Sequence, residues 1–287
     1  MNISVLGCGR WGSFIAWYLA QRGNCVTSWG PEGDASYEVL KNTGRNEYVS
    51  LDERITLTCD LEQAVTTAEI IVISISSQGL RGFMQRIVKY PVQDKVFVLC
   101  MKGIETGTGK RLSEILLESG ISSDIIAVWV GPGHIQSFVQ GVPNCMVIDS
   151  ENGELKKRLV DQFKSDLIRF YYGNDLLGTE IGAAAKIVMG FAAGILDVVC
   201  VPLKGPLMSR GAREVARLIK AMGGNELSAY GLAHLGDYET TLFSRYSHNR
   251  MYGEMLAKGQ RFEKLAEGVA TSEAMRYLGQ KYGVELP

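Results

Sequence analysis

The sequence predicts an α/β protein, with an N-terminal Rossmann-type, doubly wound sheet followed by an all-helical C-terminal domain. The length of 287 residues exceeds the usual size of one domain. The first two-thirds of the chain alternates short apolar runs with helix-like stretches, which is typical of a parallel sheet covered on both faces. After about residue 170 helical periodicity continues and no convincing strand follows, so the second domain should lack a sheet.

The expected strands are short apolar runs bounded by turn residues. The first run, 3–6, is followed by a helix over 11–22 with Phe14, Ile15 and Leu19 on one face, and Gly23 ends that helix. The full set of expected strands is 3–6, 25–29, 70–75, 96–100, 126–130 and 145–148. Because these runs are continuously apolar rather than alternating, we expect the strands to be parallel and buried on both faces.

The second domain should consist of long helices over 179–199, 207–222 and 261–282. The polar turn at 172–175 marks the junction, which gives domains of residues 1–173 and 174–287. The run 187–203 is apolar enough to suggest a membrane span. It carries Asp197 and Pro202 and falls short of about 20 residues, so we interpret it as a buried core helix or a homodimer interface.

Composition favours a small-molecule partner. Hydrophobic residues make up 46% of the chain and charged residues 21%. The formal net charge is -1, so the protein has no strong overall positive potential that would bind nucleic acid or an anionic membrane. The six cysteines lie far apart and the three histidines complete no zinc-ligand spacing, so no metal site is expected. The N-terminus lacks the pattern of a signal peptide, and we expect a reduced, cytoplasmic protein.

A glycine-rich loop between the first strand and the first helix carries the firmest functional signal. Gly7, Gly9 and Gly12 fit G-x-G-x-x-G. The first glycine permits a tight turn, the second lets the backbone approach a pyrophosphate, and the third allows close packing of helix on strand. The helix N-terminus offers free N–H groups to the phosphates. The alternative is a glycine-rich turn without a ligand, but the position between strand and helix favours a dinucleotide.

The residues after the second strand bear on the choice of cofactor. An acidic residue there would bond the ribose hydroxyls of NAD, whereas an arginine would accept the extra phosphate of NADP. Glu32 is the nearest acid, although Gly30 and Pro31 leave its direction open. The cofactor is therefore expected to be NAD or NADP, with a slight preference for NAD.

Further motifs make the prediction more specific, and with them the chain resembles the NAD(P)-dependent glycerol-3-phosphate dehydrogenase family as a divergent member. The matches occur in family order over almost the whole length. They are the glycine loop with Trp11, Arg45-Asn46 with Tyr48, Lys102-Gly103-Ile104-Glu105, Gly131-Pro132 with His134, the run from Glu180 to Lys186, the run from Gly231 to Asp237, Ser247-His248-Asn249-Arg250, and Glu267-Gly268-Val269.

The resemblance implies roles for individual residues. Lys186 corresponds to the lysine that exchanges a proton with the substrate oxygen, Lys102 to a lysine that touches cofactor and substrate, and Asp237 to a substrate-binding acid. The implied substrate contacts are Gly131, Ser247, His248 and Asn249, and the implied cofactor contacts are Gly7, Gly9, Arg10, Trp11, Gly12, Ile135 and Glu267.

These roles also make chemical sense. Hydride addition to a ketone creates alkoxide charge, and a lysine ammonium stabilises that charge and supplies a proton. The usual lysine pKa of about 10.4 is too high for efficient proton exchange near neutral pH, but burial or a second cation lowers it. The structural alternatives are that Lys186 snorkels out of an apolar helix, Lys102 lies on a surface loop, and Asp237 caps a turn.

Several substitutions at the substrate end depart from the family pattern. Ile187 replaces an asparagine, His248 an arginine expected to meet phosphate, Gly133 a serine, and Ile135 an alanine, while Arg10 stands where a small polar residue is usual. A histidine lacks the guanidinium fork that suits a phosphate. Whether Arg250, Arg245 or Lys204 compensates is not decided by sequence.

Three functions therefore remain open. The first is an oxidoreductase that interconverts dihydroxyacetone phosphate and glycerol 3-phosphate, or a closely related polyol phosphate. The second is a reductase of a different keto or hydroxy substrate on the same scaffold, and the third a non-catalytic dinucleotide-binding sensor. A small, phosphorylated substrate is the expected partner in the first case, and a homodimer is an open possibility in all three.

Overall fold

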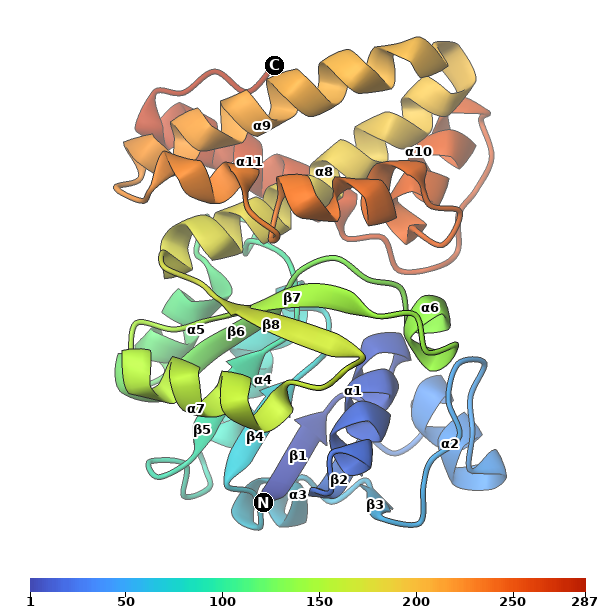
Figure 1. Cartoon of the computed structure of the whole chain (residues 1–287), viewed down its shortest axis with the longest axis vertical. Helices are drawn as coiled ribbons and strands as arrows, with labels where there is room; N and C mark the ends of the chain where they lie inside the picture. The colour runs from blue at the N-terminus through green and yellow to red at the C-terminus, as the bar shows by residue number, and fades with distance from the viewer.

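A single eight-stranded sheet forms the N-terminal half of the molecule in a computed structural model that describes all residues, 1–287 (Figure 1). The strand order is β3-β2-β1-β4-β5-β6-β7-β8. The strands are β1 (Asn2–Leu6), β2 (Cys25–Trp29), β3 (Ile55–Thr58), β4 (Ile70–Ile73), β5 (Val96–Leu99), β6 (Ile126–Val130), β7 (Asn144–Asp149) and β8 (Ile168–Tyr172). The chain reverses its winding between β1 and β4, which makes the sheet doubly wound.

The expectation of an entirely parallel sheet is wrong at one edge. Strands β1 to β6 are parallel, but β7 pairs antiparallel with β6, and β8 then runs parallel to β7. The apolar run in β7 reports burial on both faces, and burial does not encode strand direction. The edge strands β3 and β8 escaped prediction because each is half-exposed and carries polar residues among its apolar ones.

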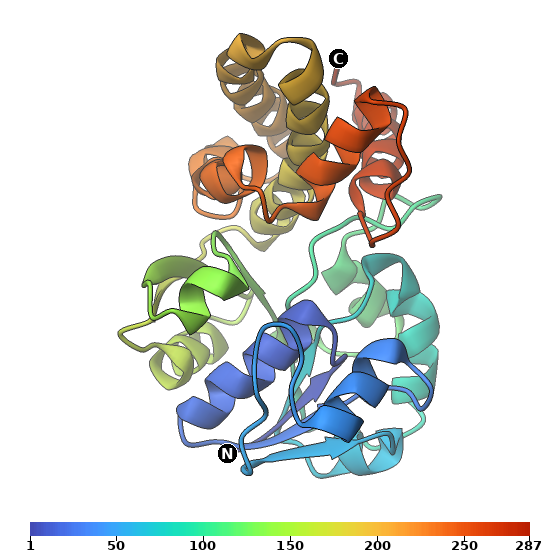
Figure 2. The ribbon, with the colours of Figure 1, turned by 90° about the vertical axis from the view of Figure 1, so that its right-hand side faces the viewer.

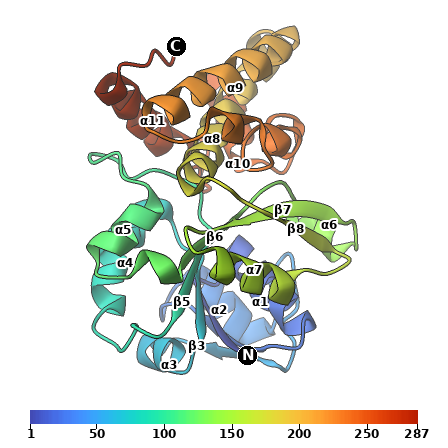
Figure 3. The same cartoon turned by 60° about the vertical axis from the view of Figure 1, so that its left-hand side comes forward.

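Helices cover both faces of the sheet. They are α1 (Arg10–Gln21), α2 (Ala35–Thr43), α3 (Leu61–Thr66), α4 (Leu80–Ile87), α5 (Leu112–Glu118), α6 (Ile135–Val139) and α7 (Gly153–Phe163). One core packs α1, α6 and α7 against the sheet, and a second packs α3, α4 and α5 against the opposite face (Figure 3). Alternate residues of β4 enter the two cores, Ile70 and Val72 one, Ile71 and Ile73 the other, as a doubly covered sheet requires.

The C-terminal part is helical and forms the end of the molecule opposite the N-terminus (Figure 2). It contains α8 (Leu176–Val199), α9 (Lys204–Ala221), α10 (His248–Ala257) and α11 (Gly268–Tyr282), with 3-10 and π turns between α8 and α10 and a loop between α10 and α11. Its core joins α8, α9 and α11. The helix expected over 261–282 starts only at Gly268, and α10 was not expected at all.

Helix α8 is the apolar segment that raised the question of a membrane span. Its most apolar window has a mean hydropathy of 1.7, and 56% of that window is buried. The helix packs against α9, α10 and α11, which is the arrangement of a core helix. Strand β8 ends at Tyr172 and α8 begins at Leu176. We therefore propose residue 173 as the boundary between the sheet domain and the helical domain.

Candidate active site

A cavity of about 770 Å³ lies where the carboxyl ends of the parallel strands face the helical domain. This is the position at which open α/β sheets bind their ligands. Its walls come from the glycine loop, the segments that follow β2, β4 and β5, the first turn of α10 and the residue before α11. Every site residue predicted from the sequence lines this cavity except Gly12, Gly131 and Asp237, which lie behind the wall.

The glycine loop has the geometry that its sequence predicts. Gly7 adopts φ +113°, and a Cβ there would collide with the carbonyl oxygen of Ser74 beyond β4. A Cβ on Gly12 would collide with the carbonyl oxygen of Gly7, so this glycine allows helix and loop to pack closely. Gly9 has open space where its Cβ would be and caps α1 without a side chain. The first N–H groups of α1 are therefore accessible to an anion.

The end of the cavity next to β2 contains one carboxylate and one guanidinium. Glu32 is exposed and lies outside the lining, and the acid that faces the cavity is Asp34. One oxygen of Asp34 accepts hydrogen bonds from the backbone N–H groups of Ser36 and Tyr37, which caps α2. Arg86 lines the same end, with its guanidinium 5.7 Å from the ring centre of Trp29. An acid after the second strand is the group that binds the ribose of NAD, and an arginine there is the group that accepts the extra phosphate of NADP.

Two lysines from different domains meet at one carboxylate oxygen. Lys102 lies just beyond β5, and its Nζ donates to Asp237 Oδ2 at 2.9 Å and to the carbonyl oxygen of Gly131 at 3.0 Å. Lys186, in the middle of α8, donates to the same Oδ2 and to Thr241 Oγ1 at 3.0 Å. When both lysines are protonated, the group contains two cations and one anion, and one net positive charge remains beside the cavity.

Burial is the main electrostatic influence on this group. Lys186 is almost completely buried, and burial lowers its pKa to about 7, with the charge of Lys102 acting in the same direction and that of Asp237 opposing it. For Asp237, burial works to raise the pKa, but Lys102 and Lys186 together hold it below its ordinary value. Lys186 is therefore poised to gain and lose a proton near neutral pH.

Asp237 is held in place by its neighbours in the chain. Thr240 Oγ1 donates to its second carboxylate oxygen. His234, three residues earlier in the chain, is fully buried, with Nδ1 2.8 Å from the carbonyl oxygen of Gly182 on α8. Because that carbonyl only accepts, Nδ1 carries the proton, and His234 Nε2 accepts from the Tyr238 hydroxyl at 2.7 Å. These bonds fix the turn that carries Asp237 against the helix that carries Lys186.

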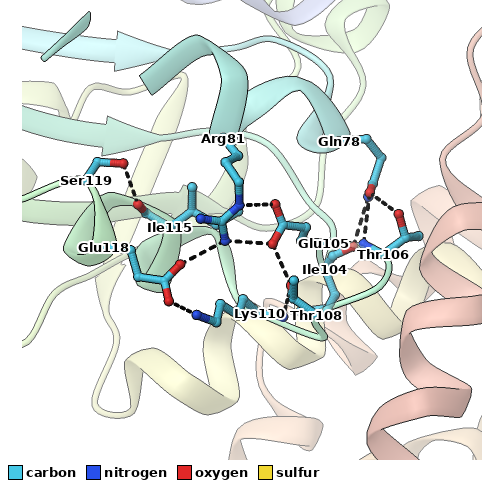
Figure 4. A network of polar contacts seen from close by, with 10 residues as sticks. All are labelled: Gln78, Arg81, Ile104, Glu105, Thr106, Thr108, Lys110, Ile115, Glu118 and Ser119. Atoms are coloured by element: carbon cyan, nitrogen blue, oxygen red, sulfur yellow. Dashed lines mark hydrogen bonds and ion pairs between the residues drawn. The ribbon is translucent and has the colours of Figure 1, made fainter. Parts of the chain in front are cut away.

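The loop that carries Lys102 is fixed by a polar network (Figure 4). Gln78 accepts from the backbone N–H of Thr106 at 3.0 Å and donates to the carbonyl oxygen of Ile104 at 2.9 Å. Arg81 forms ion pairs with Glu105 at 2.7 Å and with Glu118 at 2.8 Å. The network ties this loop to α4 and α5, so the ammonium of Lys102 projects from a rigid support.

Glu267 connects the two domains at the edge of the cavity. Its Oε1 accepts from the backbone N–H of Ser77 at 2.7 Å and from the hydroxyls of Ser76 and Ser77 at 3.0 and 2.9 Å. Asn249 Oδ1 accepts from the backbone N–H of Gly268 at 2.9 Å, which joins α10 to the start of α11.

Comparison with known proteins decides the family. A model described as the NAD-dependent glycerol-3-phosphate dehydrogenase N-terminus matches residues 2–156, and one described as the C-terminus of that enzyme matches residues 175–287. The chain belongs to the NAD-dependent glycerol-3-phosphate dehydrogenase family. It is 34% identical to the glycerol-3-phosphate dehydrogenase, NAD(P)+, of Prosthecochloris aestuarii, over 100% of this chain and 91% of that protein. The enzyme of the same description from Thermoanaerobacter sp. is also 34% identical, over 100% of this chain and 90% of its own.

Solved structures agree with this assignment. The glycerol-3-phosphate dehydrogenase of Coxiella burnetii superimposes with a TM-score of 0.92 at 26% identity, covering 100% of this chain and 91% of that one. A D-mandelate dehydrogenase solved with NADH shares the fold at a TM-score of 0.67 and 18% identity, covering 99% of this chain and 94% of its own. The solved structure from Coxiella burnetii and the family model confirm the predicted fold class, and the family model and the relatives confirm the predicted oxidoreductase class and the NAD or NADP cofactor.

One departure from the family pattern, His248, lies at the start of α10, directly after the matched residue Ser247. Ser247 lines the cavity but also caps α10, since its Oγ accepts from the backbone N–H of Arg250 at 3.3 Å. His248 lines the cavity with Nδ1 3.2 Å from the carbonyl oxygen of Leu265. Burial, followed by the charge of Arg10, lowers the pKa of His248 to about 4. The imidazole is therefore neutral at pH 7 and brings no positive charge.

The three basic residues named as possible substitutes do not face the cavity. Arg250 and Lys204 both form ion pairs with Asp197, on a side of the helical domain that is not part of the lining. Arg245 is exposed and donates to the hydroxyl of its neighbour Tyr246 at 2.9 Å. None of the three therefore takes over the role of the arginine that the family has at the position of His248.

Several lining residues were missed by sequence reasoning. They are Ser76, Thr240, Thr241 and Tyr246, together with Trp29, Phe83 and Arg86 at the β2 end. Thr240 and Thr241 lie in a π-helical turn, a feature frequent at functional sites but without a reliable sequence signature. The remaining ones come from segments distant in sequence, and only the fold brings them together.

Proposed function

We propose that this chain interconverts dihydroxyacetone phosphate and glycerol 3-phosphate, with NADH or NADPH as the hydride donor in the reducing direction. The observation that carries the proposal is the pairing of Lys102 and Lys186 on one oxygen of Asp237, directly beside a cavity that begins at a dinucleotide-type glycine loop. The names of the relatives support the same reaction.

The residues around the cavity fit a dinucleotide. The open space at Gly9 and the free N–H groups of α1 suit a pyrophosphate, and Trp11, Ile135 and Glu267 line the cavity beyond the loop. A bound nicotinamide supplies the hydride. Lys102 Nζ lies 5.9 Å from the ring centre of Trp11, which places a cation next to the indole at the catalytic end of the cavity.

The proton is handled by Lys186. When a carbonyl carbon receives hydride, its oxygen gains negative charge, and the ammonium of Lys186 transfers a proton to that oxygen. The ammonium of Lys102 stabilises the developing charge, and Asp237 holds both lysines in position. The substrate-binding roles of Gly131, Ser247, His248 and Asn249 are part of this proposal. Gly131 acts through its carbonyl, which positions Lys102.

A related reductase activity on a different keto or hydroxy substrate is the second candidate. The observations that favour it are the buried Ile187 and the neutral His248 in the cavity wall, because both remove polar contacts that a phosphorylated triose would use. The catalytic residues and the cofactor would be the same in both cases, so only the substrate separates them. A non-catalytic sensor would have no use for the low pKa of Lys186.

The deciding experiment measures oxidation of NADH and NADPH with dihydroxyacetone phosphate by the wild type and by Lys186→Ala. We expect the substitution to lower kcat by about 100- to 10,000-fold while NADH binding is retained, because a positioned acid contributes that much. Lys164→Ala, which removes an exposed lysine paired with Asp161 on the surface, is the matched control. Tight NADH binding without consumption of dihydroxyacetone phosphate would shift the proposal to the second candidate.

We propose further that the chain acts in the cytoplasm and as a homodimer. All six cysteines are free, as suits a reducing compartment. The end of α8 and the turn after it expose a row of aliphatic side chains, Val198, Val199, Val201 and Leu203, and large apolar groups of this kind mark interaction surfaces. The first half of α8 is buried in the core, so only its last turn and the following residues are available to a partner.

A further inference from the structure

Arg10 is a half-buried cation in the cavity wall without an acidic partner. It is the first residue of α1 and lines the cavity directly after the glycine loop. Its Nη1 lies 3.4 Å from the carbonyl oxygen of Tyr246, a long contact that leaves most of its five N–H groups available. Arg10 also has a hydrogen-bond partner in the Tyr48 hydroxyl, and the charge of Glu47 acts on it from nearby, but Arg10 forms no ion pair. A guanidinium in this setting favours an anionic ligand.

The other cations of this region are engaged. Lys102 and Lys186 share Asp237, and Arg86 lies at the opposite end of the cavity over Trp29. The neutral imidazole of His248 adds no charge, and burial likewise lowers the pKa of His134 to about 4. Arg10 is therefore the one guanidinium at the catalytic end of the cavity that is free to bind an anion.

The side chain of Arg10 also reaches the catalytic end of the cavity. Its contact with Tyr246 brings the guanidinium from α1 across to the beginning of α10, where Ser247 and His248 line the cavity. Arg10 and His248 are close enough that the charge of Arg10 helps to lower the pKa of His248. Two departures from the family pattern, an added arginine and a lost one, thus face the same space from opposite domains.

We propose that Arg10 binds a phosphate group in this cavity, and that it supplies from α1 the guanidinium that the family otherwise carries at the position of His248. The ligand chemistry is a phosphate oxygen, which can belong to the substrate or to the pyrophosphate of the cofactor. The proposal rests on the proposed function for the identity of the substrate, but not for the existence of the anion site.

The test removes the guanidinium at position 10 and restores one at position 248. We compare wild type, Arg10→Ser, His248→Arg and the double variant, and measure KM for dihydroxyacetone phosphate and for NADH separately. Loss of one charge-assisted contact should raise the affected KM about 10- to 100-fold in Arg10→Ser. His248→Arg should restore most of that loss in the double variant, because it returns a guanidinium to the same space. Arg22→Ser, at the far end of α1, is the matched control.

The two KM values identify the phosphate. A rise confined to dihydroxyacetone phosphate assigns Arg10 to the substrate, and a rise confined to NADH assigns it to the pyrophosphate. Unchanged KM values for both in Arg10→Ser overturn the proposal, as does a double variant no better than Arg10→Ser. Thermal unfolding of each variant shows whether a loss reflects binding or folding.

A second readout separates this proposal from the proposed function. Inorganic phosphate should raise the Tm of the wild type, since a ligand that binds only the folded state stabilises it, and this rise should be lost in Arg10→Ser. If the wild type does not reduce dihydroxyacetone phosphate but phosphate still raises its Tm through Arg10, the proposed substrate fails and the anion site stands. Equal rises in wild type and Arg10→Ser would contradict the anion site.

Discussion

At the scale of single residues, Lys186 shows how a helix interior can be used to tune a lysine. The surrounding turns of α8 are apolar, and the charged form of the side chain loses its hydration there. Asp237 and Thr241 provide enough partners to keep the ammonium in place, but not enough to offset the loss completely. The result is a lysine whose pKa is lowered to about 7, so that it exchanges its proton near neutral pH.

The pH dependence of the reaction should follow Lys186. Ketone reduction needs its protonated form, so kcat/KM for reduction should fall as the pH rises through about 7, and oxidation should rise over the same range. Because the charge of Lys102 helps to lower the pKa of Lys186, Lys102→Met should move both midpoints upward by about one pH unit. Steady-state rates measured at about a dozen pH values between 5.5 and 9 give the midpoint even where the absolute rate has fallen. An unchanged midpoint would contradict this account.

The residues that sequence could identify are those that lie within ordered motifs. Lys102, Lys186 and Asp237 were predicted in this way, and the fold brings all three together at one oxygen atom. Thr241 and Arg10 were harder cases. The first has no motif of its own, and the second was predicted as a cofactor contact without any signal that its side chain crosses to Tyr246. Spatial relations between distant segments are set by tertiary packing, which a single sequence does not display.

At the scale of secondary-structure elements, the positions of α8 and the turn Leu235–Asp237 depend on one buried histidine. His234 bonds to the carbonyl oxygen of Gly182 with one ring nitrogen and to the Tyr238 hydroxyl with the other. A side chain on Gly182 would press against the Cβ of His234, so the glycine lets the two elements approach closely. This arrangement transmits the position of α8 to Asp237.

Tyr238→Phe should therefore weaken both the fold and the catalytic geometry. The substitution leaves Nε2 of the buried His234 without its donor, and an unsatisfied buried polar atom costs about 1–3 kcal/mol in the free energy of unfolding. Urea unfolding measures that cost, and we expect kcat to fall alongside because Asp237 is in the same turn. Tyr230→Phe, at an exposed tyrosine, is the control. Wild-type stability in Tyr238→Phe would show that the bond to His234 contributes nothing.

Helices and strands could be predicted where their burial requires an apolar sequence. The interior strands β1, β4, β5 and β6 were expected close to their observed bounds, since all are buried along their length apart from Asn2 at the start of β1. Direction at the β7 edge was not predictable, because an apolar run is the same read either way. Helix α10 was missed because only Gly253 in it is buried, so it shows little of the periodicity that marks a core-facing helix.

At the scale of the whole molecule, the catalytic centre depends on both domains. Lys102 and Gly131 come from the sheet domain, and Lys186 and Asp237 from the helical domain. The domains are joined by Glu267 with Ser76 and Ser77, and by the buried ion pair of Arg111 with Glu180 at 2.8 Å. A change in the angle between the domains would therefore separate the two lysines and alter the pKa of Lys186.

The helical domain also offers the surface on which the proposed homodimer can be tested. Val199 is 68% exposed and Val201 54%, although both belong to an otherwise apolar segment. Val199→Asp should convert a dimer of the 31.5 kDa chain to a monomer, because a carboxylate buried at an apolar contact has no partner. Sedimentation velocity at micromolar concentration measures the change. Val39→Asp, at a similarly exposed valine on α2, should leave the assembly intact.

A monomeric wild type, or a Val199→Asp variant that still sediments as a dimer, would place this surface outside any interface. Retained activity in a monomeric variant would show in addition that each catalytic centre is complete within one chain, as the shared carboxylate of Asp237 implies.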